Sequence, residues 1–148
     1  IILFIWKKLM RKDLDWLRVY RQHPLFEKCV SVNCHKGWIS LLEETVKYIE
    51  YSNRRTDFDL LITQVKPKFG LLVIYIEPQD HTNLRGKHLH EFTEICNQVE
   101  NITNKSSKMC KICGDKLVTT VDDLQIVNRC LEHFHERQGN FRVRRIKI

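Results

Sequence analysis

The chain has 148 residues, 43% of them hydrophobic, and carries a formal net charge of +7 at pH 7. This length is enough for one ordinary hydrophobic core with a small satellite lobe, and it excludes two full-sized domains. The opening apolar run ends at Lys7, far short of the roughly 20 residues of a membrane-spanning helix, and no secretory-signal pattern accompanies it. We therefore expect a cytoplasmic protein without a membrane span.

The charge is divided unevenly along the chain. Residues 1–36 carry eight basic and three acidic side chains, residues 37–104 carry seven and ten, and residues 105–148 carry ten and five. Basic ends around a mildly acidic middle are typical of contact with a polyanion or an acidic protein surface, although solubility alone also explains them. The same boundaries separate a basic amphipathic helical extension, an α+β core and a zinc-binding lobe with a basic tail, which we expect to pack as one compact domain.

Two helices are predicted in the first third of the chain. Apolar residues recur at helical spacing over residues 2–21, with basic residues between them, and the pattern ends before Pro24. Such a helix packs on its own core more often than on a membrane surface or an acidic partner. A second helix is predicted over residues 37–52, with a core face formed by Trp38, Leu41, Leu42, Thr45 and Ile49.

The middle of the chain predicts two strands and a third helix. Residues 58–77 are rich in β-branched and apolar residues, and Pro67 and Gly70 mark a turn between two strands. We expect an antiparallel hairpin in which residues 71–76 form a central strand buried on both faces. A helix should follow over residues 84–102, with a core stripe of Phe92, Ile95, Cys96, Val99 and Ile102, and then a loop over residues 104–108. The predicted fold class is α+β, with a small antiparallel sheet packed against helices.

The last part of the chain predicts a C-x2-C turn, a helix and an edge strand. The helix should begin at Asp122 or Asp123, either of which can cap it. Its core face would consist of Leu124, Val127, Leu131 and Phe134. The strand should cover residues 141–148, where the alternation of apolar and polar residues is interrupted by two arginines.

Four residues in this part have the spacing of metal ligands. One turn can bring the thiolates of Cys110 and Cys113 to the same ion, and Gly114 supplies the backbone freedom that this turn needs. After sixteen intervening residues, Cys130 and His133 stand three positions apart, on the same side of a helix. Three sulfur donors and one imidazole predict tetrahedral Zn²⁺. Because protein fills all four positions, the predicted zinc is structural and not catalytic.

Other candidate ligands stay as alternatives. His135 competes with His133 for the fourth position of the zinc site. A second metal site, against which we favour buried free thiols, would be formed by Cys29, Cys34, His35 and His23. A surface cluster that we interpret as solvated residues consists of His81, His88, His90, Asp80 and Glu91. His88 and His90 would lie on different sides of a helix, which speaks against joint ligation.

The stretch from Gln64 to Gly70 precedes the two ligand pairs, and with this combination residues 38–133 resemble a widespread group of small uncharacterised bacterial and phage proteins. Their shared stretch reads roughly Gln-Ile-Lys-Glu-Lys-Phe-Gly and is followed by a CxxCG and a CxxH pair. In this chain the stretch is matched by Gln64, Lys66, Lys68, Phe69 and Gly70, and the pairs by Cys110, Cys113, Cys130 and His133. Pro67 departs from the acidic residue that is usual in the group. The resemblance implies the same core fold and metal site, and it implies no particular activity.

Familiar enzyme signatures are missing from the sequence. Zinc-dependent nucleic-acid deaminases need H-x-E ahead of P-C-x-x-C, but no His stands two positions before Glu91, and Met109 replaces the proline. HNH nucleases carry a catalytic His between the two ligand pairs, but none occurs between Gly114 and Asp123, and that connector looks too short for two strands. There is also no glycine-rich phosphate loop and no G-x-S-x-G motif.

The sequence therefore favours a zinc-stabilised, non-catalytic binding module that contacts another macromolecule, with a protein as the favoured partner. The first alternative is nucleic-acid binding through the basic zinc lobe and tail, whose candidate contacts are Lys108, Lys111, Lys116, Arg142, Arg144 and Arg145. The second alternative is an enzyme, an HNH-like nuclease or a hydrolase, with a site that leaves no local motif.

Overall fold

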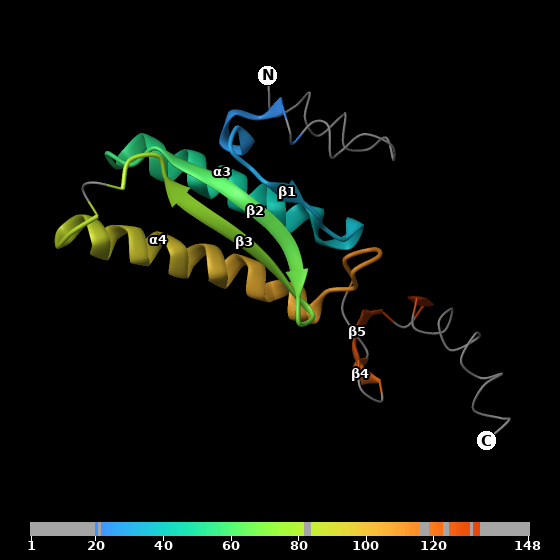
Figure 1. The fold of residues 1–148 in the computed structure, drawn as a ribbon. Coiled ribbons are helices and arrows are strands. Elements are labelled where there is room, and N and C mark those ends of the chain that lie inside the picture. Colours follow the sequence, from blue (N-terminus) through green and yellow to red (C-terminus); the bar gives the residue numbers. More distant parts are fainter. Residues whose placement is uncertain are drawn as a thin grey trace, which may run out of the picture.

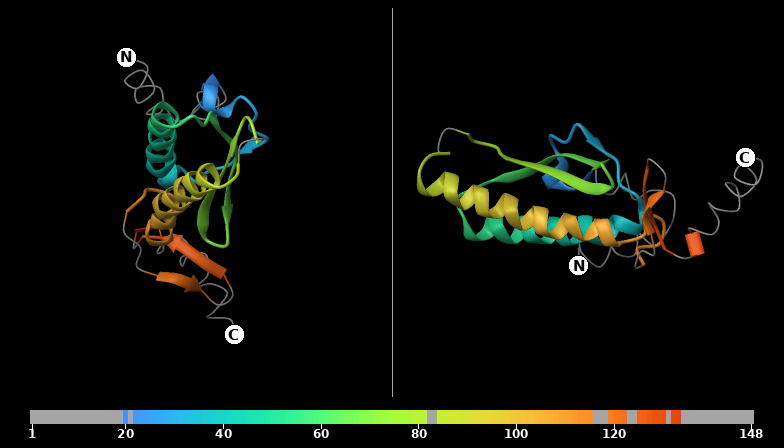
Figure 2. Two further views of the ribbon diagram at one scale, coloured as in Figure 1. Left: turned by 90° about the vertical axis from the view of Figure 1, so that its left-hand side faces the viewer. Right: turned by 90° about the horizontal axis from the view of Figure 1, so that it is seen from below.

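A three-stranded sheet is covered on one face by two helices in the computed structural model, which describes residues 20, 22–81, 84–115, 119–122, 125–130 and 132–133 (Figure 1). The helices α3 (Ile39–Arg55) and α4 (Lys87–Asn104) lie side by side in one layer and the sheet forms the other (Figure 2). The sheet consists of β1 (Ser31–Val32), β2 (Leu60–Lys68) and β3 (Leu71–Pro78). The predicted α+β class is confirmed.

The second predicted helix is present as α3, and it lies at the centre of the core. A short 3-10 helix, η2 (Lys36–Trp38), leads into it, and Trp38 is only 1% exposed. The helix runs three residues past the predicted end. There the Asn53 side chain accepts a hydrogen bond from the Leu60 amide and donates one to the Leu60 carbonyl, which fixes the start of β2. The residues that α3 buries are Leu41, Leu42, Thr45, Val46, Ile49 and Ser52.

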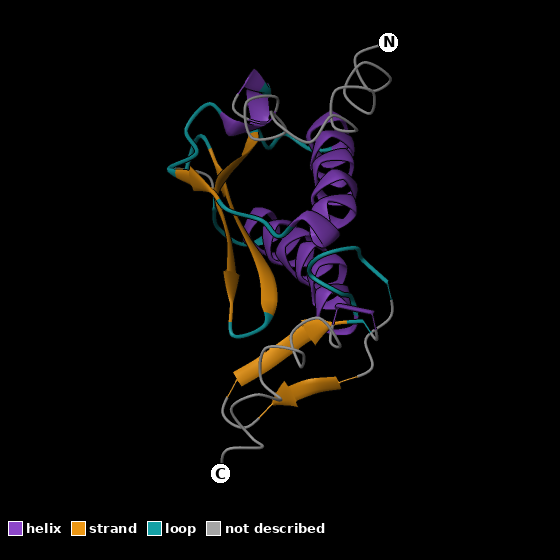
Figure 3. Cartoon of the chain, turned by 90° about the vertical axis from the view of Figure 1, so that its right-hand side faces the viewer, coloured by secondary structure: helices purple, strands orange, loops and turns teal. Residues whose placement is uncertain are grey.

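The predicted hairpin is present, but its central strand was wrongly assigned. The order of strands is β1-β2-β3, with β1 parallel and β3 antiparallel to β2, so β2 is central and β3 lies at an edge. Buried and more exposed residues alternate along β3, and Tyr75 and Glu77 are exposed. Residues 71–76 are therefore buried on one face only, because both helices pack on the same side of the sheet (Figure 3). The apolar run of residues 71–76 suggested burial on both faces. It did not show that helices cover only one face of this strand.

A bulge in β2 decides which side chains face the helices. The pairing register shifts between Ile62 and Gln64, which leaves Thr63 as the extra residue. Before the bulge Leu60 and Ile62 face the core, and after it Val65 does. The bulge thereby turns Gln64 to the opposite face, beside its cross-strand partner Tyr75.

The turn of the hairpin consists of Phe69 and Gly70, two residues later than Pro67. Both have positive φ, 51° and 77°, as a two-residue turn between twisted strands requires. Pro67 lies inside β2 opposite Leu72. The Leu72 amide donates to the hydroxyl of Ser106 and not to β2, so the missing amide hydrogen of Pro67 breaks no bond of this ladder.

The third predicted helix corresponds to α4, with its buried residues at Ile95, Val99, Ile102 and Thr103 and with Phe92 and Cys96 packed against the core. Residues 105–108 are not a loop as predicted but a 3-10 helix, η3 (Lys105–Lys108). Ser106 explains the difference, because it is fully buried and its hydroxyl also donates to the Thr103 carbonyl. The polar sequence of this segment concealed its contact with β3.

The helix predicted from Asp122 or Asp123 is wrong over residues 122–129. An antiparallel hairpin of β4 (Thr119–Asp122) and β5 (Gln125–Arg129) occupies this stretch (Figure 3). Its β-branched residues favour strands, and two residues, 123 and 124, separate them. The helical spacing of Leu124 and Val127 therefore does not reflect a helix here, whereas Glu132 and His133, further along the predicted helix, are helical.

The first part of the described chain belongs to the core. Tyr20 is fully buried. Leu25 and Phe26, which belong to the 3-10 helix η1 (Pro24–Phe26), are almost completely buried. The predicted helix over residues 2–21, apart from Tyr20, and the predicted strand over residues 141–148 lie outside the described residues. Within the described residues, no helix combines the length and apolar character needed to cross a membrane.

Candidate metal centre

The structure brings together the four residues predicted as metal ligands. One donor atom from each of Cys110, Cys113, Cys130 and His133 lies within 4.8 Å of all the others. The Sγ atoms of Cys113 and Cys130 are 3.5 Å apart. The Nδ1 atom of His133 lies 3.5 Å from Sγ of Cys110 and 3.2 Å from Sγ of Cys130.

These separations fit one tetrahedral ion. With metal–sulfur bonds of about 2.3 Å and metal–nitrogen bonds of about 2.05 Å, the edges of a zinc tetrahedron measure about 3.8 Å between sulfurs and about 3.6 Å between sulfur and nitrogen. The three distances given above are within a few tenths of an ångström of those values, and no two of the four donor atoms lie more than 4.8 Å apart. A disulfide would need about 2.05 Å, so the 3.5 Å between Cys113 and Cys130 belongs to separate thiols.

A tight turn presents the first ligand pair. The Gly114 amide donates to the Cys110 carbonyl at 2.8 Å, and the Cys110 amide donates to the Asp115 carbonyl at 2.7 Å. Gly114 has φ +84°, a conformation that side-chain-bearing residues rarely adopt. The Ile112 amide points at Sγ of Cys110, 3.4 Å away, and so stabilises a thiolate there.

The second ligand pair follows directly after β5. Cys130 is buried, and the Arg129 guanidinium donates to the His133 carbonyl at 3.2 Å, which holds the chain between the two ligands in a closed shape. Cys130 thus stands at the end of the hairpin, and, of the helix that the i, i+3 spacing suggested, the structure describes Glu132 and His133 as helical.

The thiols of Cys110 and Cys113 differ in acidity. Burial raises the pKa of Cys110, but amide hydrogen bonds from Cys113, Cys130 and Ile112 outweigh it and together lower that pKa to about 6. The Asp115 amide lowers the pKa of Cys113, yet burial and the thiols of Cys130 and Cys110 raise it to about 12. Crowded thiols that cannot all ionise are suited to a divalent cation, which replaces their protons on binding.

The first half of the site is joined to the core through Gly37. Its amide donates to the Lys111 carbonyl at 2.8 Å, and the Trp38 indole Nε1 donates to the Met109 carbonyl at 3.0 Å. A Cβ atom on Gly37 would lie only 2.1 Å from the Cys110 carbonyl oxygen and 2.6 Å from the Gly114 nitrogen. Only glycine allows this approach of two backbones. Sequence analysis missed Gly37, although a glycine just before a helix-lining tryptophan was a visible signal.

The alternative ligands do not gather. Cys29, Cys34, His35 and His23 are all described, and they form no metal-binding group. The Cys34 thiol donates to the His35 carbonyl, and burial raises the pKa of Cys34 to about 12. His23 contacts Glu50 at 2.7 Å. His135 lies outside the described residues.

The surface histidines pair locally with glutamates. His81 lies 3.9 Å from Glu77, His88 lies 3.9 Å from Glu91, and His90 lies 3.1 Å from Glu94. Over the described part of the chain, neither they nor Asp80 belong to a group of metal donors.

The β4–β5 hairpin corrects one argument against a nuclease, because two strands do fit between the ligand pairs. The other argument stands, since residues 114–129 contain no histidine that could act as the catalytic base.

The predicted basic contacts are only partly described. Lys108 is exposed and Lys111 is half-buried beside the first ligand pair. Lys116, Arg142, Arg144 and Arg145 lie outside the described residues.

Comparison with known proteins adds no relative: no protein-family model, no curated protein and no solved structure matches this chain.

Proposed function

We propose that this chain is a non-catalytic binding module whose C-terminal lobe is held by one structural Zn²⁺ and whose surface contacts another macromolecule. The observation that supports the proposal is the clustering of Cys110, Cys113, Cys130 and His133, whose donor atoms all lie within 4.8 Å of one another. All four donors come from protein, so an ion bound by them has no open position at which water or substrate could be activated. A zinc ion there would stabilise structure and would not supply a nucleophile.

The zinc would act by joining two parts of the chain. The first ligand pair is fastened to the core through Gly37 and Trp38, whereas the second pair is at the end of the β4–β5 hairpin. An ion shared by both pairs would fix the hairpin on the core. Rigid placement of a small lobe is useful for recognition, because it reduces the ordering cost of binding.

The remaining parts of the proposal follow from sequence. Resemblance to the group of bacterial and phage proteins supports the same fold and metal, and we propose a cytoplasmic location. A protein partner was favoured from sequence, with nucleic acid as the alternative. Among the described residues, the only group of three or more such donors is the Cys110, Cys113, Cys130 and His133 cluster.

Elemental analysis of the purified chain tests the zinc. We expect one zinc per chain, and Cys113→Ser should lower the content to well below one. Cys29→Ser is the matched control, because Cys29 is a free cysteine outside the cluster, and it should retain one zinc. A zinc-free wild-type protein that keeps its fold after treatment with chelator would refute the proposal.

A further inference from the structure

The second face of the sheet, opposite the helices, carries an arrangement that folding does not require. Gln64 and Tyr75 are cross-strand partners on this face, and Lys66 and Val73 are the next pair. We call the surface formed by Gln64, Lys66, Lys68, Phe69 and Tyr75, together with Lys28, the open face. Both α3 and α4 lie on the other side of the sheet, so neither covers this face (Figure 3).

Aromatic rings and lysines alternate on the open face. The Lys66 ammonium lies 5.5 Å from the centre of the Tyr75 ring, and the Lys68 ammonium lies 5.8 Å from the centre of the Phe69 ring. Tyr75 is 38% and Phe69 is 82% exposed. Among the described residues, Lys66 and Lys68 form no ion pair with a carboxylate. Their charge is therefore free to meet an anion.

Phe69 is unfavourable for the fold in two ways. Its φ of +51° suits glycine or asparagine, and an L-residue with a large side chain loses roughly 1 kcal/mol or more there. Its ring also lies in solvent, where it gains nothing from burial. A residue that lowers stability without packing points to a role outside the folded chain itself.

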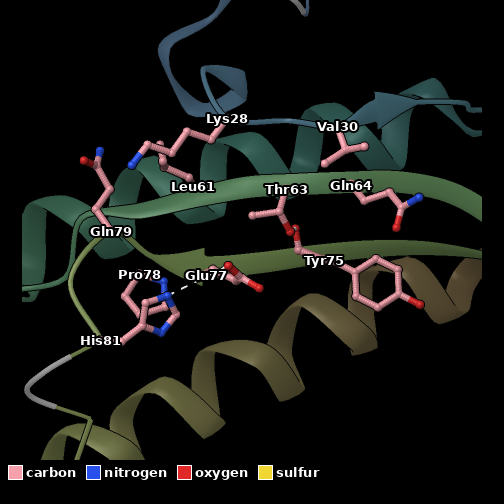
Figure 4. Close-up of a pocket in the computed structure, with 10 residues that line it drawn as sticks. All are labelled: Lys28, Val30, Leu61, Thr63, Gln64, Tyr75, Glu77, Pro78, Gln79 and His81. Carbon is pink, nitrogen blue, oxygen red and sulfur yellow. Dashed lines mark hydrogen bonds and ion pairs between the residues drawn. The ribbon is translucent and has the colours of Figure 1, made fainter.

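Next to Tyr75 the open face is hollowed. A cavity of about 630 Å³ lies over β2 and β3 and is bounded by the segment with Lys28 and Val30 on one side and by Gln79 and His81 on the other (Figure 4). Thr63, Gln64 and the Glu77 carboxylate, which lies 3.9 Å from His81, supply polar groups between these walls, and the Tyr75 ring lies at one end of the hollow (Figure 4). Its volume is in the range of small-ligand sites, which makes it large enough for a nucleobase.

We propose that the open face binds single-stranded nucleic acid, with bases stacked on Tyr75 and Phe69 and phosphates paired with Lys28, Lys66 and Lys68. This inference rests on the proposed function, for which it names the class of partner. Exposed aromatic rings beside basic side chains are the usual platform for unpaired bases, because every base offers a flat π-face. An open sheet presents such rings in one plane.

The same composition argues against a protein partner at this face. Protein interfaces are enriched in aromatic residues, but they are depleted in lysine, which loses both hydration and side-chain freedom on burial. Phosphates leave the ammonium groups hydrated and release counterions instead. Exposed aromatic rings suit both a protein partner and nucleic acid. The lysines beside them favour nucleic acid.

Fluorescence anisotropy with the full zinc-loaded chain tests the proposal. The probes are a labelled twelve-nucleotide oligothymidylate, an oligouridylate of equal length and a duplex of the same length, each titrated between 50 and 200 mM salt. Three phosphate contacts predict a slope of about −2 for log K against log salt concentration. The single strands should bind more tightly than the duplex, because paired bases cannot stack on the rings.

Variants of the hairpin locate the binding. Phe69→Asn keeps a residue that accepts positive φ while removing the ring, and we expect a 5- to 150-fold loss of affinity, roughly the range for one stacked base. Lys66→Gln with Lys68→Gln should reduce the salt slope by about 1.4. Matched controls are available on α3, where Arg55 lies 4.7 Å from the exposed ring of Tyr51 and Lys47 is exposed nearby. Tyr51→Asn and the pair Lys47→Gln with Arg55→Gln remove the same groups elsewhere and should leave binding unchanged.

Each outcome separates this inference from the proposed function. Single-strand binding that is weakened by the hairpin variants and not by the α3 variants supports it. No binding, equal loss in both sets of variants, or equal affinity for the duplex overturns it. Zinc content and thermal melting are measured on every preparation. A folded chain with one zinc and no nucleic-acid affinity would leave the zinc-stabilised module intact, whereas a zinc-free chain would remove the proposed function whatever the oligonucleotides do.

Discussion

The α+β core and the metal lobe of this protein are held together by different kinds of interaction. In the core, large apolar side chains from α3, β2 and β3 are buried against one another, among them Leu42, Ile49 and Ile62, all fully buried. In the metal lobe, which comprises the described residues from 109 to 133, β4 and β5 make their main element-to-element contacts with each other. The lobe meets the core through the backbone of Gly37 and through the Trp38 indole, which donates to the Met109 carbonyl.

This difference indicates where stability comes from in each part. A core of buried aliphatic side chains gains from removal of apolar surface from water, at roughly 25 cal/mol per Å². A two-stranded hairpin alone is marginal in water and needs another support. The core should therefore fold without metal, and the lobe should depend on it. The experiments below separate the two contributions.

Removal of the metal should have the largest effect, and it should be confined to the lobe. Structural zinc contributes about 10–16 kcal/mol to the folding of small zinc peptides, far more than a hairpin can supply. We expect a strong chelator to abolish hydrogen-exchange protection over residues 119–130, while the amides of α3 and β2 stay protected. Simultaneous loss of protection in both parts would show that the core also requires the ion.

Leu42→Ala should have the opposite effect: it should destabilise the core and leave the metal lobe unchanged. Leu42 is fully buried within the apolar cluster, and such truncations lower the free energy of unfolding by about 2–5 kcal/mol. The effect would appear in the midpoint of urea unfolding followed by the circular dichroism of the helices, at saturating zinc. At urea concentrations too low to unfold the variant, its zinc affinity should equal that of wild type. A large drop in zinc affinity in this folded variant would contradict the separation of core and lobe.

Gly37→Ala should disturb the junction between core and lobe. It should lower both the stability of the core and the zinc affinity of the lobe, each by less than the two changes above. The added methyl group would lie 2.1 Å from the Cys110 carbonyl oxygen, so one backbone must move. Overpacking of this kind lowers stability by about 1–3 kcal/mol, and here it should also weaken zinc binding because the first ligand pair shifts. Competition with a chromogenic chelator measures the affinity.

Gly86→Ala is the control for the junction. Gly86, unlike Gly37, has a positive φ, +56°, and a Cβ atom there would meet nothing within 4 Å. This variant should lose a little stability through backbone strain and keep its zinc affinity. Equal zinc affinities in the two alanine variants would mean that the approach of Gly37 to the ligand turn has no consequence for the metal.

The sequence predicted the parts that depend on local pattern and on ligand chemistry. The periodicity of residues 37–52 located α3, and the spacing of Cys110, Cys113, Cys130 and His133 selected the four residues that lie together. Cysteine and histidine pairs are informative because few other roles require such spacing. The identity of the ion stays a prediction.

Tertiary contacts explain what the sequence did not reveal. The place of β3 at an edge depends on β1, a two-residue strand that sequence alone does not announce. The bulge at Thr63 reverses which residues of β2 are inside, and a periodicity argument assumes an uninterrupted strand. The helix expected after Asp122 failed over residues 122–129 because apolar residues at helical spacing also fit a short hairpin.

The smallest expected effect concerns His35, which reports directly on the junction. Its ring packs edge-on against Trp38, with 4.8 Å between ring centres. Burial lowers the pKa of His35, and the positive charges of Lys111 and Arg129, which flank the two ligand pairs, lower it further. Below the ordinary histidine pKa of about 6.5, the unfolded chain takes up a proton that the folded chain resists. Stability from this group is therefore complete above that pH and is lost as pH falls toward the folded pKa.

Titration of the His35 imidazole by NMR should give a midpoint below that of a free histidine. In Gly37→Ala, where Lys111 and Arg129 would be displaced together with the ligand turn, the midpoint should move back up. His35→Phe provides the thermodynamic check, because its stability should fall less between pH 7 and pH 5.5 than that of wild type. Protonation of the zinc ligands is common to both proteins at equal excess zinc, so the difference between them isolates His35. A wild-type midpoint at or above that of a free histidine would mean that Lys111 and Arg129 do not lie close enough to His35 to lower its pKa. The close junction inferred from Gly37 would then have no effect on His35.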